Sequence, residues 1–317
     1  MSFFHKQNCH FSYPVVSMGT FDGVHLGHQK LLQYLRKRAD QMKGEAVVIT
    51  YYHHPLETIH KKTFPYLLTG REHKERLLRS LGVDYILYLD FNEELANMSP
   101  DDFLRNILLN EIDMKEIIAG YDTHFGKNRQ GNYAFLKQNS QQFSYRADLV
   151  KPFMIDNRIV SSSLIRDFIR EGDMITTSRF LGRSYSISGK VVAGKKIGRN
   201  LGFPTINVSP LEFNKLVPGI GVYICEVLWR GKCYQGTTNI GYSPTIKQNA
   251  YKEIETFILD FSENLYGEEV EIIFHKKLRD EIDFHSKADL ITNIEKDVEQ
   301  TREYFHRNSL DKISQHE

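Results

Sequence analysis

The hydrophobic pattern of this chain changes its period near residue 182, and the change divides the sequence into two parts. Before this point, short apolar runs alternate with longer segments in which apolar residues recur at helical spacing. After it, short runs follow one another closely, with glycine-containing turns between them. A chain of 317 residues is also long enough to form two cores of ordinary size. We therefore expect two domains, residues 1–182 and residues 183–317.

The first part has the pattern of an α/β domain. Residues 14–20 predict a short buried strand, and residues 28–42 predict a helix with leucines along one side. Further strands are predicted at 45–52, 83–90 and 117–119, and further helices at 71–81 and 99–109. Because strands alternate with helices, we expect a Rossmann-like parallel sheet with helices on both faces. Ligands would bind beyond the carboxyl ends of its strands.

The second part predicts an antiparallel β-structure. The runs YSISGKVVAG, GVYICEVLWRGKCYQG, EIETFILDF and EVEIIFHKKL are short and rich in strand-forming residues. Closely spaced short strands with glycine turns are typical of a barrel or a sandwich. A terminal helix is also expected, because apolar residues follow helical spacing near the end of the chain. They are Leu290, Ile294, Val298 and Phe305.

The composition is that of a soluble globular protein, with 41% hydrophobic and 26% charged residues. A net charge of +1 gives no field that would draw the chain to nucleic acid or to an anionic membrane. No apolar run approaches the roughly 18 residues needed to span a bilayer, and no signal peptide is evident. Cys9, Cys225 and Cys233 form no C-x-x-C pair, so neither a disulfide framework nor a zinc ribbon is suggested. We expect a cytoplasmic protein that binds neither nucleic acid nor membrane.

The stretch GTFDGVHLGH, residues 19–28, lies between a predicted strand and a predicted helix. Backbone N–H groups and the helix dipole make such a position an anion site. Gly19, Gly23 and Gly27 would let a phosphate approach the backbone closely. His25 and His28 are three residues apart and would share a face at the start of the helix. A triphosphate site is the favoured interpretation, and a simple histidine cap or a zinc pair are the alternatives.

The stretch GKVVAGKKIGRNLGFPTIN, residues 189–207, is a second basic, glycine-rich segment. Its first part nearly matches a P-loop, but Lys196 stands where that motif needs serine or threonine, and no helix pattern follows. We therefore exclude a Walker A fold. Either a glycine-rich loop that covers phosphates or a solvated hairpin would fit this composition.

Glu255 interrupts an apolar row in the run EIETFILDF. Strand alternation places its side chain on the same face as Phe257, Leu259 and Phe261. A carboxylate in an apolar row is costly unless it has a partner or a task. A partner within the barrel, a solvent-facing edge strand and a catalytic role all remain open on the pattern alone.

These motifs resemble those of bacterial bifunctional riboflavin kinases/FAD synthetases, over roughly residues 15–305. In the first part, GTFDGVHLGHQ, TYYHHP (50–55), GYDTHFGKNRQGN (120–132) and SSSLIR (161–166) resemble the adenylyltransferase motifs. In the second, LGFPTIN (201–207), PGIGVY (218–223), NIGYSPT (239–245) and LRDEIDF (278–284) resemble the riboflavin kinase pattern. The resemblance implies a nucleotidyltransferase domain followed by a riboflavin kinase barrel with a terminal helix. Its implied substrates are ATP, riboflavin and FMN, its final product is FAD, and Mg²⁺ is its implied cofactor.

The resemblance also implies roles for individual residues in the first domain. His25 and His28 would hold the ATP phosphates, and the Arg166 guanidinium would bind phosphate oxygens. The phosphate-binding set is completed by Gly19, Phe21, Asp22, Gly23, Ser162 and Ser163, with Asp122 and Phe125 at the flavin.

In the second domain, the resemblance implies that Glu255 is the general base that accepts the ribityl hydroxyl proton. Thr205 and Asn207 would bind Mg²⁺ and ATP phosphate oxygens. The remaining implied residues are Gly194, Lys195, Gly198 and Arg199 at the phosphates, and Arg279, Glu281 and Phe284 at the flavin. The implied enzyme is a monomer or a weak homo-oligomer.

Four residues depart from the family pattern: His53, Thr123, His124 and Phe257. The first three lie in adenylyltransferase motifs, so an enzyme that retains only the kinase activity is the main alternative. A non-catalytic flavin carrier and a nucleotidyltransferase of another substrate are further alternatives, and both fit fewer of the motifs.

Overall fold

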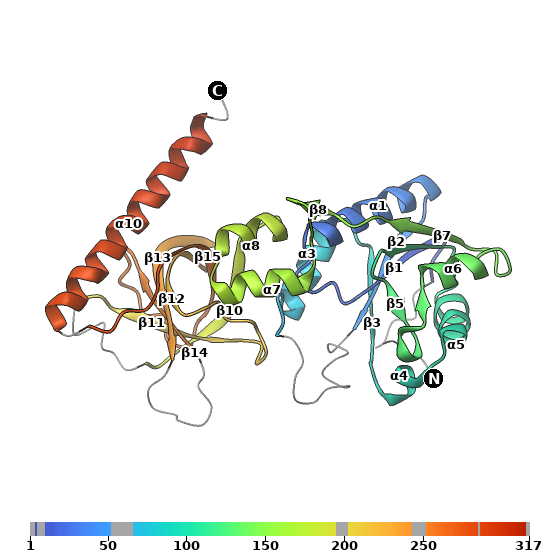
Figure 1. Cartoon of the computed structure of the whole chain (residues 1–317), viewed down its shortest axis with the longest axis horizontal. Helices are drawn as coiled ribbons and strands as arrows, with labels where there is room; N and C mark the ends of the chain where they lie inside the picture. The colour runs from blue at the N-terminus through green and yellow to red at the C-terminus, as the bar shows by residue number, and fades with distance from the viewer. Residues whose placement is uncertain are drawn as a thin grey trace. The chain divides into compact units, whose positions relative to one another are not determined.

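The computed structural model describes residue 4 and residues 10–51, 66–194, 202–242, 252–284 and 286–314, with side chains to residue 309. The chain divides into two compact units, Met1–Ser162 and Ser163–Glu317 (Figure 1). Helices α7 (Ser162–Glu171) and α8 (Met174–Leu181) belong almost entirely to the second unit. There α8 contacts two barrel strands, and the backbone N–H of Gly219 donates to the carbonyl of Ile169 in α7.

The first unit contains a five-stranded parallel sheet, as the sequence predicts. The strand order is β3-β2-β1-β4-β7. From β1 the chain first adds β2 and β3 on one side and then β4 and β7 on the other, so the order of addition changes between β1 and β4. This pair is the place where an open α/β sheet commonly binds its ligand. The strands are β1 (Pro14–Met18), β2 (Glu45–Tyr51), β3 (Tyr85–Leu89), β4 (Glu116–Gly120) and β7 (Arg146–Val150).

Helices cover both faces of this sheet (Figure 1). On one face, α1 (Leu26–Met42) and α3 (Arg71–Ser80) bury leucines such as Leu32 and Leu78 in one core. The other face packs against Leu104, Ile107 and Leu136 in a second core. The elements on this face are α4 (Glu93–Asn97), α5 (Pro100–Asp102), which continues as the π-helical segment η1 (Phe103–Glu111), and α6 (Tyr133–Asn139). Short segments complete the unit: β5 (His124–Phe125), η2 (Lys127–Arg129), β6 (Gly131–Asn132), β8 (Met154–Ile155) and β9 (Arg158–Ile159).

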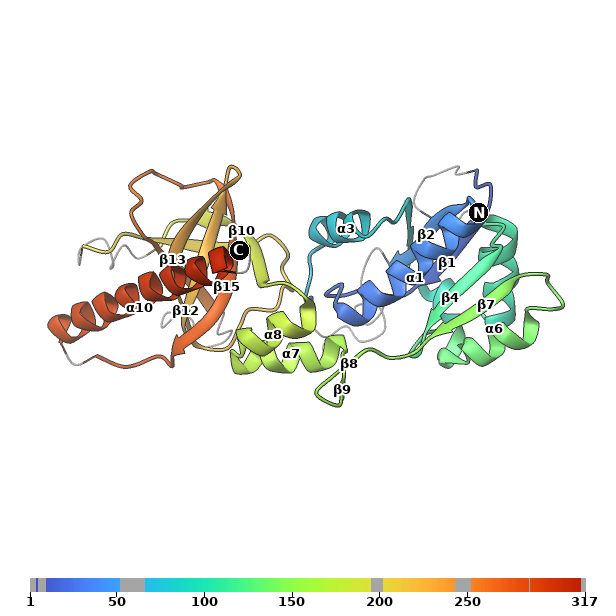
Figure 2. The ribbon, with the colours of Figure 1, turned by 90° about the horizontal axis from the view of Figure 1, so that it is seen from above.

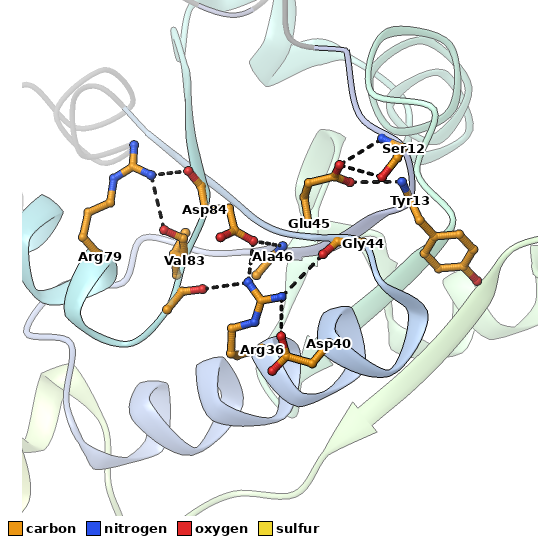
Figure 3. A network of polar contacts seen from close by, with 11 residues as sticks. Ser12, Tyr13, Arg36, Asp40, Gly44, Glu45, Ala46, Arg79, Val83 and Asp84 are labelled. Carbon is orange, nitrogen blue, oxygen red and sulfur yellow. Dashed lines mark hydrogen bonds and ion pairs between the residues drawn. The ribbon is translucent and has the colours of Figure 1, made fainter.

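The end of the sheet at which β2 and β3 begin is closed by a polar network (Figure 3). Arg36 of α1 forms ion pairs with Asp40 and Asp84, and Asp84 also accepts a hydrogen bond from the backbone N–H of Ala46. The Glu45 carboxylate accepts from the backbone and hydroxyl of Ser12 and from the backbone of Tyr13. These contacts tie the N-terminal ends of the strands together and leave the carboxyl ends for a site.

The second unit contains a closed antiparallel barrel of six strands. Of the two architectures that the sequence predicts for this part, the barrel is therefore correct and the sandwich is not. The strand order is β10-β11-β14-β13-β12-β15. The strands are β10 (Tyr185–Val192), β11 (Thr205–Pro210), β12 (Gly221–Trp229), β13 (Lys232–Tyr242), β14 (Lys252–Ile258) and β15 (Glu269–Arg279).

Strand β14 alternates between the interior and the exterior of the barrel. Ile254, Thr256 and Ile258 are buried, whereas Glu255 and Phe257 between them are partly exposed. The interior is not wholly apolar, since the Thr256 hydroxyl joins a short chain of hydrogen bonds through Thr238 to Cys225. Glu255 therefore lies on the outer face of the barrel.

Helix α10 (Lys287–Ser314) packs beside β13 (Figure 2). The expected apolar residues of this helix are only partly buried, and its most buried side chains are Asp297 and Thr301. The hydroxyl of Thr301 lies 3.1 Å from that of Thr237 in β13. Polar contacts at Thr301 therefore add to the partly buried apolar side of the helix, where the Phe305 ring packs edge-on against His275 of β15.

Candidate functional site

The loop between β1 and α1 has an unusual backbone. Phe21, Gly23 and Val24 have φ values of +49°, +87° and +39°, and such values are rare for residues with bulky side chains. The ring of Phe21 is 1% exposed, so burial holds this conformation in place. The Gly19 N–H donates to the carbonyl of Ile49 at 3.0 Å, which fixes the start of the loop against β2. The loop thus turns sharply at the carboxyl end of β1, where the sequence predicts phosphate binding.

His25 and His28 lie together at the N-terminus of α1. His25 is the N-cap residue, and its Nδ1 accepts a hydrogen bond from the backbone N–H of His28 at 3.3 Å. The two imidazole rings are stacked, with centroids 3.7 Å apart and planes 14° apart. Because Nδ1 of His25 is an acceptor, the neutral ring carries its proton on Nε2. Gly27 gives this pair room, since a Cβ there would lie 3.2 Å from the His25 ring.

The Asp22 side chain has a supporting position in the same loop. Its carboxylate is 4% exposed and accepts hydrogen bonds from the backbone N–H groups of Leu68 and Thr69. Its carbonyl oxygen accepts from the hydroxyl of Ser162 at 2.8 Å. Asp22 therefore links the loop to the segment before α3 and to Ser162, the last residue of the first unit.

The segment after β4 has one exposed and one buried part. Asp122 is exposed, and its carboxylate lies close to Gly120, where a Cβ would be 3.2 Å from Oδ1. Burial and the nearby Asp122 carboxylate raise the pKa of Tyr121. Phe125, in contrast, is 4% exposed and packs in the core against the rings of Phe103 and Phe135. Its position suits an anchor of the loop better than a surface that a flavin contacts directly.

His124, one of the departures from the family pattern, is held by the backbone of its own loop. Its Nδ1 lies 2.8 Å from the carbonyl oxygen of Asp122 and 3.3 Å from Nη2 of Arg129. A hydrogen bond to the carbonyl requires a proton on Nδ1, and that proton prevents Arg129 from donating to the same atom. The shorter contact is the one we assign as a hydrogen bond, which leaves Nε2 of His124 as the atom free of this loop contact.

The remaining predicted residues of the adenylyltransferase motifs lie in or near α7. Ser162 is in the first unit, whereas Ser163 and Arg166 are in the second. Ser163 is exposed, and Arg166 is 5% exposed. His53 lies outside the residues that the structure describes.

A row of polar side chains crosses three neighbouring strands on the outer face of the barrel. Asn207 in β11 and Asn239 in β13 are both paired with Glu255 in β14. The Thr205 hydroxyl donates to Oε1 of Glu255 at 2.5 Å. Thr205 and Glu255 are 50 residues apart in the chain. The barrel brings the motif that contains Thr205 and Asn207 next to the strand that contains Glu255.

Gly194 lies against this row. A Cβ at Gly194 would be 1.9 Å from Nδ2 of Asn207, so only glycine fits beside the amide in this arrangement. The ring of Phe203 packs edge-on against Phe257 at 5.4 Å, which supports β14 next to Glu255. Lys195, Gly198 and Arg199, the other predicted phosphate-binding residues of this segment, lie outside the described residues.

The predicted flavin-binding residues of the second unit lie at the end of β15 and directly after it. The Arg279 guanidinium donates to both carboxylate oxygens of Asp297, at 3.1 and 2.8 Å, and lies 5.7 Å from the centroid of the Phe284 ring. Glu281 is exposed and approaches the end of β13, since a Cβ at Gly241 would be 2.5 Å from its Oε1. The three predicted residues therefore belong to one segment that is attached both to α10 and to β13.

The donor set beside Glu255 suits a hard divalent cation. The Thr205 hydroxyl uses its hydrogen toward Glu255, so the oxygen lone pairs remain available, and the Asn207 amide oxygen could serve as a second neutral ligand. Within the described residues, no group of three or more His, Cys, Asp or Glu side chains is arranged to hold a metal. A cation here would thus depend on few protein oxygens together with phosphate oxygens and water.

Sequence reasoning assigned no individual role to three residues that contact the predicted ones or their loops. Asn239, inside the quoted motif NIGYSPT, is paired with Glu255, and Asp297 binds Arg279. The third is Lys74, whose ammonium donates to the carbonyl of Thr20 and the hydroxyl of Thr50. Strand alternation could have identified Asn239, since it lies between the buried residues Thr238 and Ile240. Asp297 and Lys74 carry no such signal, because charged residues on helices are usually solvated.

Two consecutive family matches cover most of the chain. Residues 8–164 match the FAD synthetase family, and residues 181–305 match the riboflavin kinase family. The first range contains the loop with His25 and His28, and the second contains the row with Thr205 and Glu255. The order of the families is therefore the order of the two sites along the chain.

Several curated proteins are similar to this chain over nearly their whole length. The bifunctional riboflavin kinase/FMN adenylyltransferase of Buchnera aphidicola subsp. Schizaphis graminum is 37% identical and covers 93% of this chain and 95% of its own. The protein of the same name from Haemophilus influenzae is 35% identical, with 95% and 97% coverage. That from Escherichia coli K12 is 32% identical, with 92% coverage of both chains.

A solved structure shares the fold. The crystal structure of a macrolide-efflux protein from Streptococcus pneumoniae superposes with a TM-score of 0.84 at 28% identity, covering 92% of this chain and 94% of that one. In the part of this chain that the structure describes, no helix is both long and apolar enough to cross a membrane. The two family matches and the extended similarity to the curated relatives together show that this chain belongs to the family of bifunctional riboflavin kinases/FMN adenylyltransferases.

Proposed function

We propose that this chain phosphorylates riboflavin to FMN in its barrel and adenylylates FMN to FAD in its α/β domain, with ATP as the donor in both steps. The observation that carries the proposal is that each unit brings together, at one place, side chains that the sequence motifs assign to its reaction. These are the stacked pair His25 and His28 in the first unit and the row around Thr205 and Glu255 in the second. For the two activities, we keep the functional boundary at residues 182 and 183.

In the adenylyl transfer, a phosphate oxygen of FMN attacks the α-phosphorus of ATP. The bond from that phosphorus to the bridging oxygen of the β-phosphate breaks, and pyrophosphate leaves. His25 and His28 donate hydrogen bonds from ring N–H groups to the triphosphate, where negative charge accumulates on the leaving group. The loop at Gly19–Val24 and the N-terminus of α1 add backbone donors. Phe21 and Gly23 of the same loop are proposed to complete this site, and the sequence motif assigns Ser163 and Arg166 to phosphate binding.

In the phosphoryl transfer, the terminal ribityl hydroxyl oxygen attacks the γ-phosphorus of ATP and ADP leaves. Glu255 accepts the hydroxyl proton as general base. The Thr205 hydrogen bond holds one oxygen of the Glu255 carboxylate and leaves the second oxygen to accept the proton of the substrate hydroxyl. Arg279, Glu281 and Phe284 are proposed to contact the flavin.

The divalent cation of the kinase site is proposed to be Mg²⁺, held by Thr205 and Asn207. When bound, it neutralises charge on the transferring phosphate. The hydrogen bond from Thr205 holds the Glu255 carboxylate in position. Gly194 has no side chain, which leaves space for the Asn207 amide. We further propose that the enzyme is cytoplasmic, where ATP is abundant, and that it is a monomer or a weak homo-oligomer.

The test is to incubate the purified chain with riboflavin and Mg²⁺-ATP and to separate the flavins by chromatography. FMN should appear first and FAD afterwards. Glu255→Gln should lower FMN formation by roughly 10²- to 10⁴-fold while FAD is still formed from added FMN. His28→Ala should do the reverse.

Each other outcome selects a different function. FMN without FAD would mean that only the kinase activity is retained, in line with the departures at Thr123 and His124. Tight flavin binding without turnover would indicate a carrier. Equal loss of both activities in either folded variant would contradict the division of labour between the two units.

A further inference from the structure

Lys74 lies at the same end of the sheet as the proposed adenylylation site. It is on α3, and its ammonium donates to the carbonyl oxygen of Thr20 at 3.4 Å and to the hydroxyl of Thr50 at 3.3 Å. Thr20 is inside the loop between β1 and α1, and Thr50 is at the end of β2. The ammonium therefore contacts the phosphate-binding loop from the β2 side.

The surroundings of this ammonium compensate its charge poorly. Both hydrogen bonds are long and go to neutral oxygens, and no carboxylate of the described residues forms an ion pair with it. The neighbouring Arg71, by contrast, is paired with Glu75. A partly buried cation without a paired anion is costly and is retained where it has a task.

We propose that Lys74 is a further phosphate-binding residue of the adenylyl-transfer site, where its ammonium contacts a phosphate of ATP or of FMN. This inference rests on the proposed function of the first unit. His25 and His28 approach the loop from α1, and Lys74 approaches it from α3, so a phosphate above the loop would meet donors from two sides. The pyrophosphate leaving group and the phosphate of FMN are both anions that this cation would bind.

A pH dependence follows from the same surroundings. Burial, with the neighbouring Arg71, lowers the pKa of Lys74 to about 8, although Asp22 and Glu75 oppose this shift. Among the described residues, the ring of Tyr88 also faces the ammonium, at 5.7 Å from its centroid. The side chain is charged below that pH and neutral above it. Adenylylation should therefore decline as the pH rises past about 8, whereas phosphorylation of riboflavin by the same protein should not decline with it.

The experiment compares the wild type with Lys74→Met, which removes the charge at similar length, and Lys74→Arg, which keeps the charge at high pH. Lys115→Met is the matched control, because Lys115 lies just before β4 at the opposite end of the sheet and pairs with Asp113. Lys74→Met should lower kcat/KM for FAD formation by roughly ten- to hundredfold and should leave FMN formation unchanged. Lys74→Arg should restore much of the rate and move its alkaline decline to higher pH.

The separate KM values identify the phosphate. A higher KM for FMN alone assigns the contact to the acceptor, a higher KM for ATP alone assigns it to the donor, and a lower kcat alone assigns it to the transition state. A purely structural role predicts a less stable Lys74→Met protein with unchanged kinetic constants and pH profile. Values of kcat and both KM within about twofold of the wild type would overturn the proposal.

Binding of inorganic pyrophosphate, measured by calorimetry, separates this inference from the proposed function. If the wild type made no FAD, the proposed function would fail, and weaker pyrophosphate binding by Lys74→Met than by Lys115→Met would still support a phosphate contact. Equal affinities in all three proteins, together with no kinetic effect, would exclude it.

Discussion

Both carboxylate oxygens of Asp297 accept hydrogen bonds from the guanidinium of Arg279, and the pair joins α10 to the end of β15. Asp297 is 5% exposed, so the pair is largely removed from water. The Nη1 group of Arg279 also donates to the carbonyl of Asp280 at 3.0 Å, which holds the beginning of the proposed flavin-binding segment. The terminal helix thus holds the proposed flavin-binding segment in place but supplies none of the residues proposed to contact the flavin.

Asp297→Asn should raise the KM for riboflavin several-fold and lower the free energy of unfolding of the second unit by about 1–3 kcal/mol, because a partly buried guanidinium loses its counter-charge. FAD formation from FMN should be unchanged. Steady-state kinetics and urea unfolding measure the two effects. Glu299→Gln, on the exposed side of the same helix, is the control. A wild-type KM for riboflavin in Asp297→Asn would show that the pair does not position the flavin segment.

Thr205→Val should lower kcat/KM for riboflavin phosphorylation by about ten- to hundredfold, since it removes both the hydrogen bond to Glu255 and an oxygen ligand. Thr205→Ser keeps the hydroxyl and should retain most of the activity. The two variants are compared at several Mg²⁺ concentrations. If the serine variant were as impaired as the valine variant, the methyl group and its packing would matter instead of the hydroxyl.

Gly194→Ala should raise the KM for ATP in the kinase reaction, because the added Cβ would displace the Asn207 amide. The effect should be at least tenfold if Asn207 binds phosphate or the cation. Gly231→Asn is a suitable control, since Gly231 has φ +77° with no atom within 4 Å of a new Cβ, and asparagine tolerates that φ. Unchanged kinetics in Gly194→Ala would remove Asn207 from the proposed site.

Glu45 should contribute to the acid stability of the first unit. Burial raises the pKa of Glu45, but hydrogen bonds from Ser12 and Tyr13 outweigh it and lower the pKa below its ordinary value of 4.5. A lowered folded-state pKa gives stability that is present above the unfolded value and is lost as the pH falls through the folded value. Thermal unfolding of Glu45→Gln should therefore depend less on pH below about 4.5 than that of the wild type. Equal slopes, with Glu94→Gln as control, would contradict this assignment.

The sequence predicts the parallel sheet correctly because its strands and helices have clear, different periods. It also brings His25 and His28 to one face, because three-residue spacing at a helix start has a single geometric consequence. For Glu255, alternation correctly places Phe257 on the same face, but β14 ends at Ile258 and Leu259 is buried, so the predicted row does not extend further. Alternation also does not show that this face is the outer one. That depends on how the barrel closes through strands far away in the chain.

Local sequence patterns do not predict the contacts of Lys74 and Asp297. Each is a charged residue on a helix, and its partner is distant in the chain: Thr20 and Thr50 for the first, Arg279 for the second. Local pattern also does not show the burial of Phe125. Its motif implies a flavin contact, whereas its ring lies in the core. Pairings of this kind are decided by tertiary packing and not by spacing.

Strand β14 carries its packing residues and its proposed catalytic residue on alternate positions, from Ile254 to Ile258. A substitution at Glu255 can therefore change chemistry while the interior stays filled. Insertion or deletion of a single residue in this strand would instead turn the carboxylate inward and expose the aliphatic side chains to water. Natural variants of this strand should accordingly differ in residue type and keep their length.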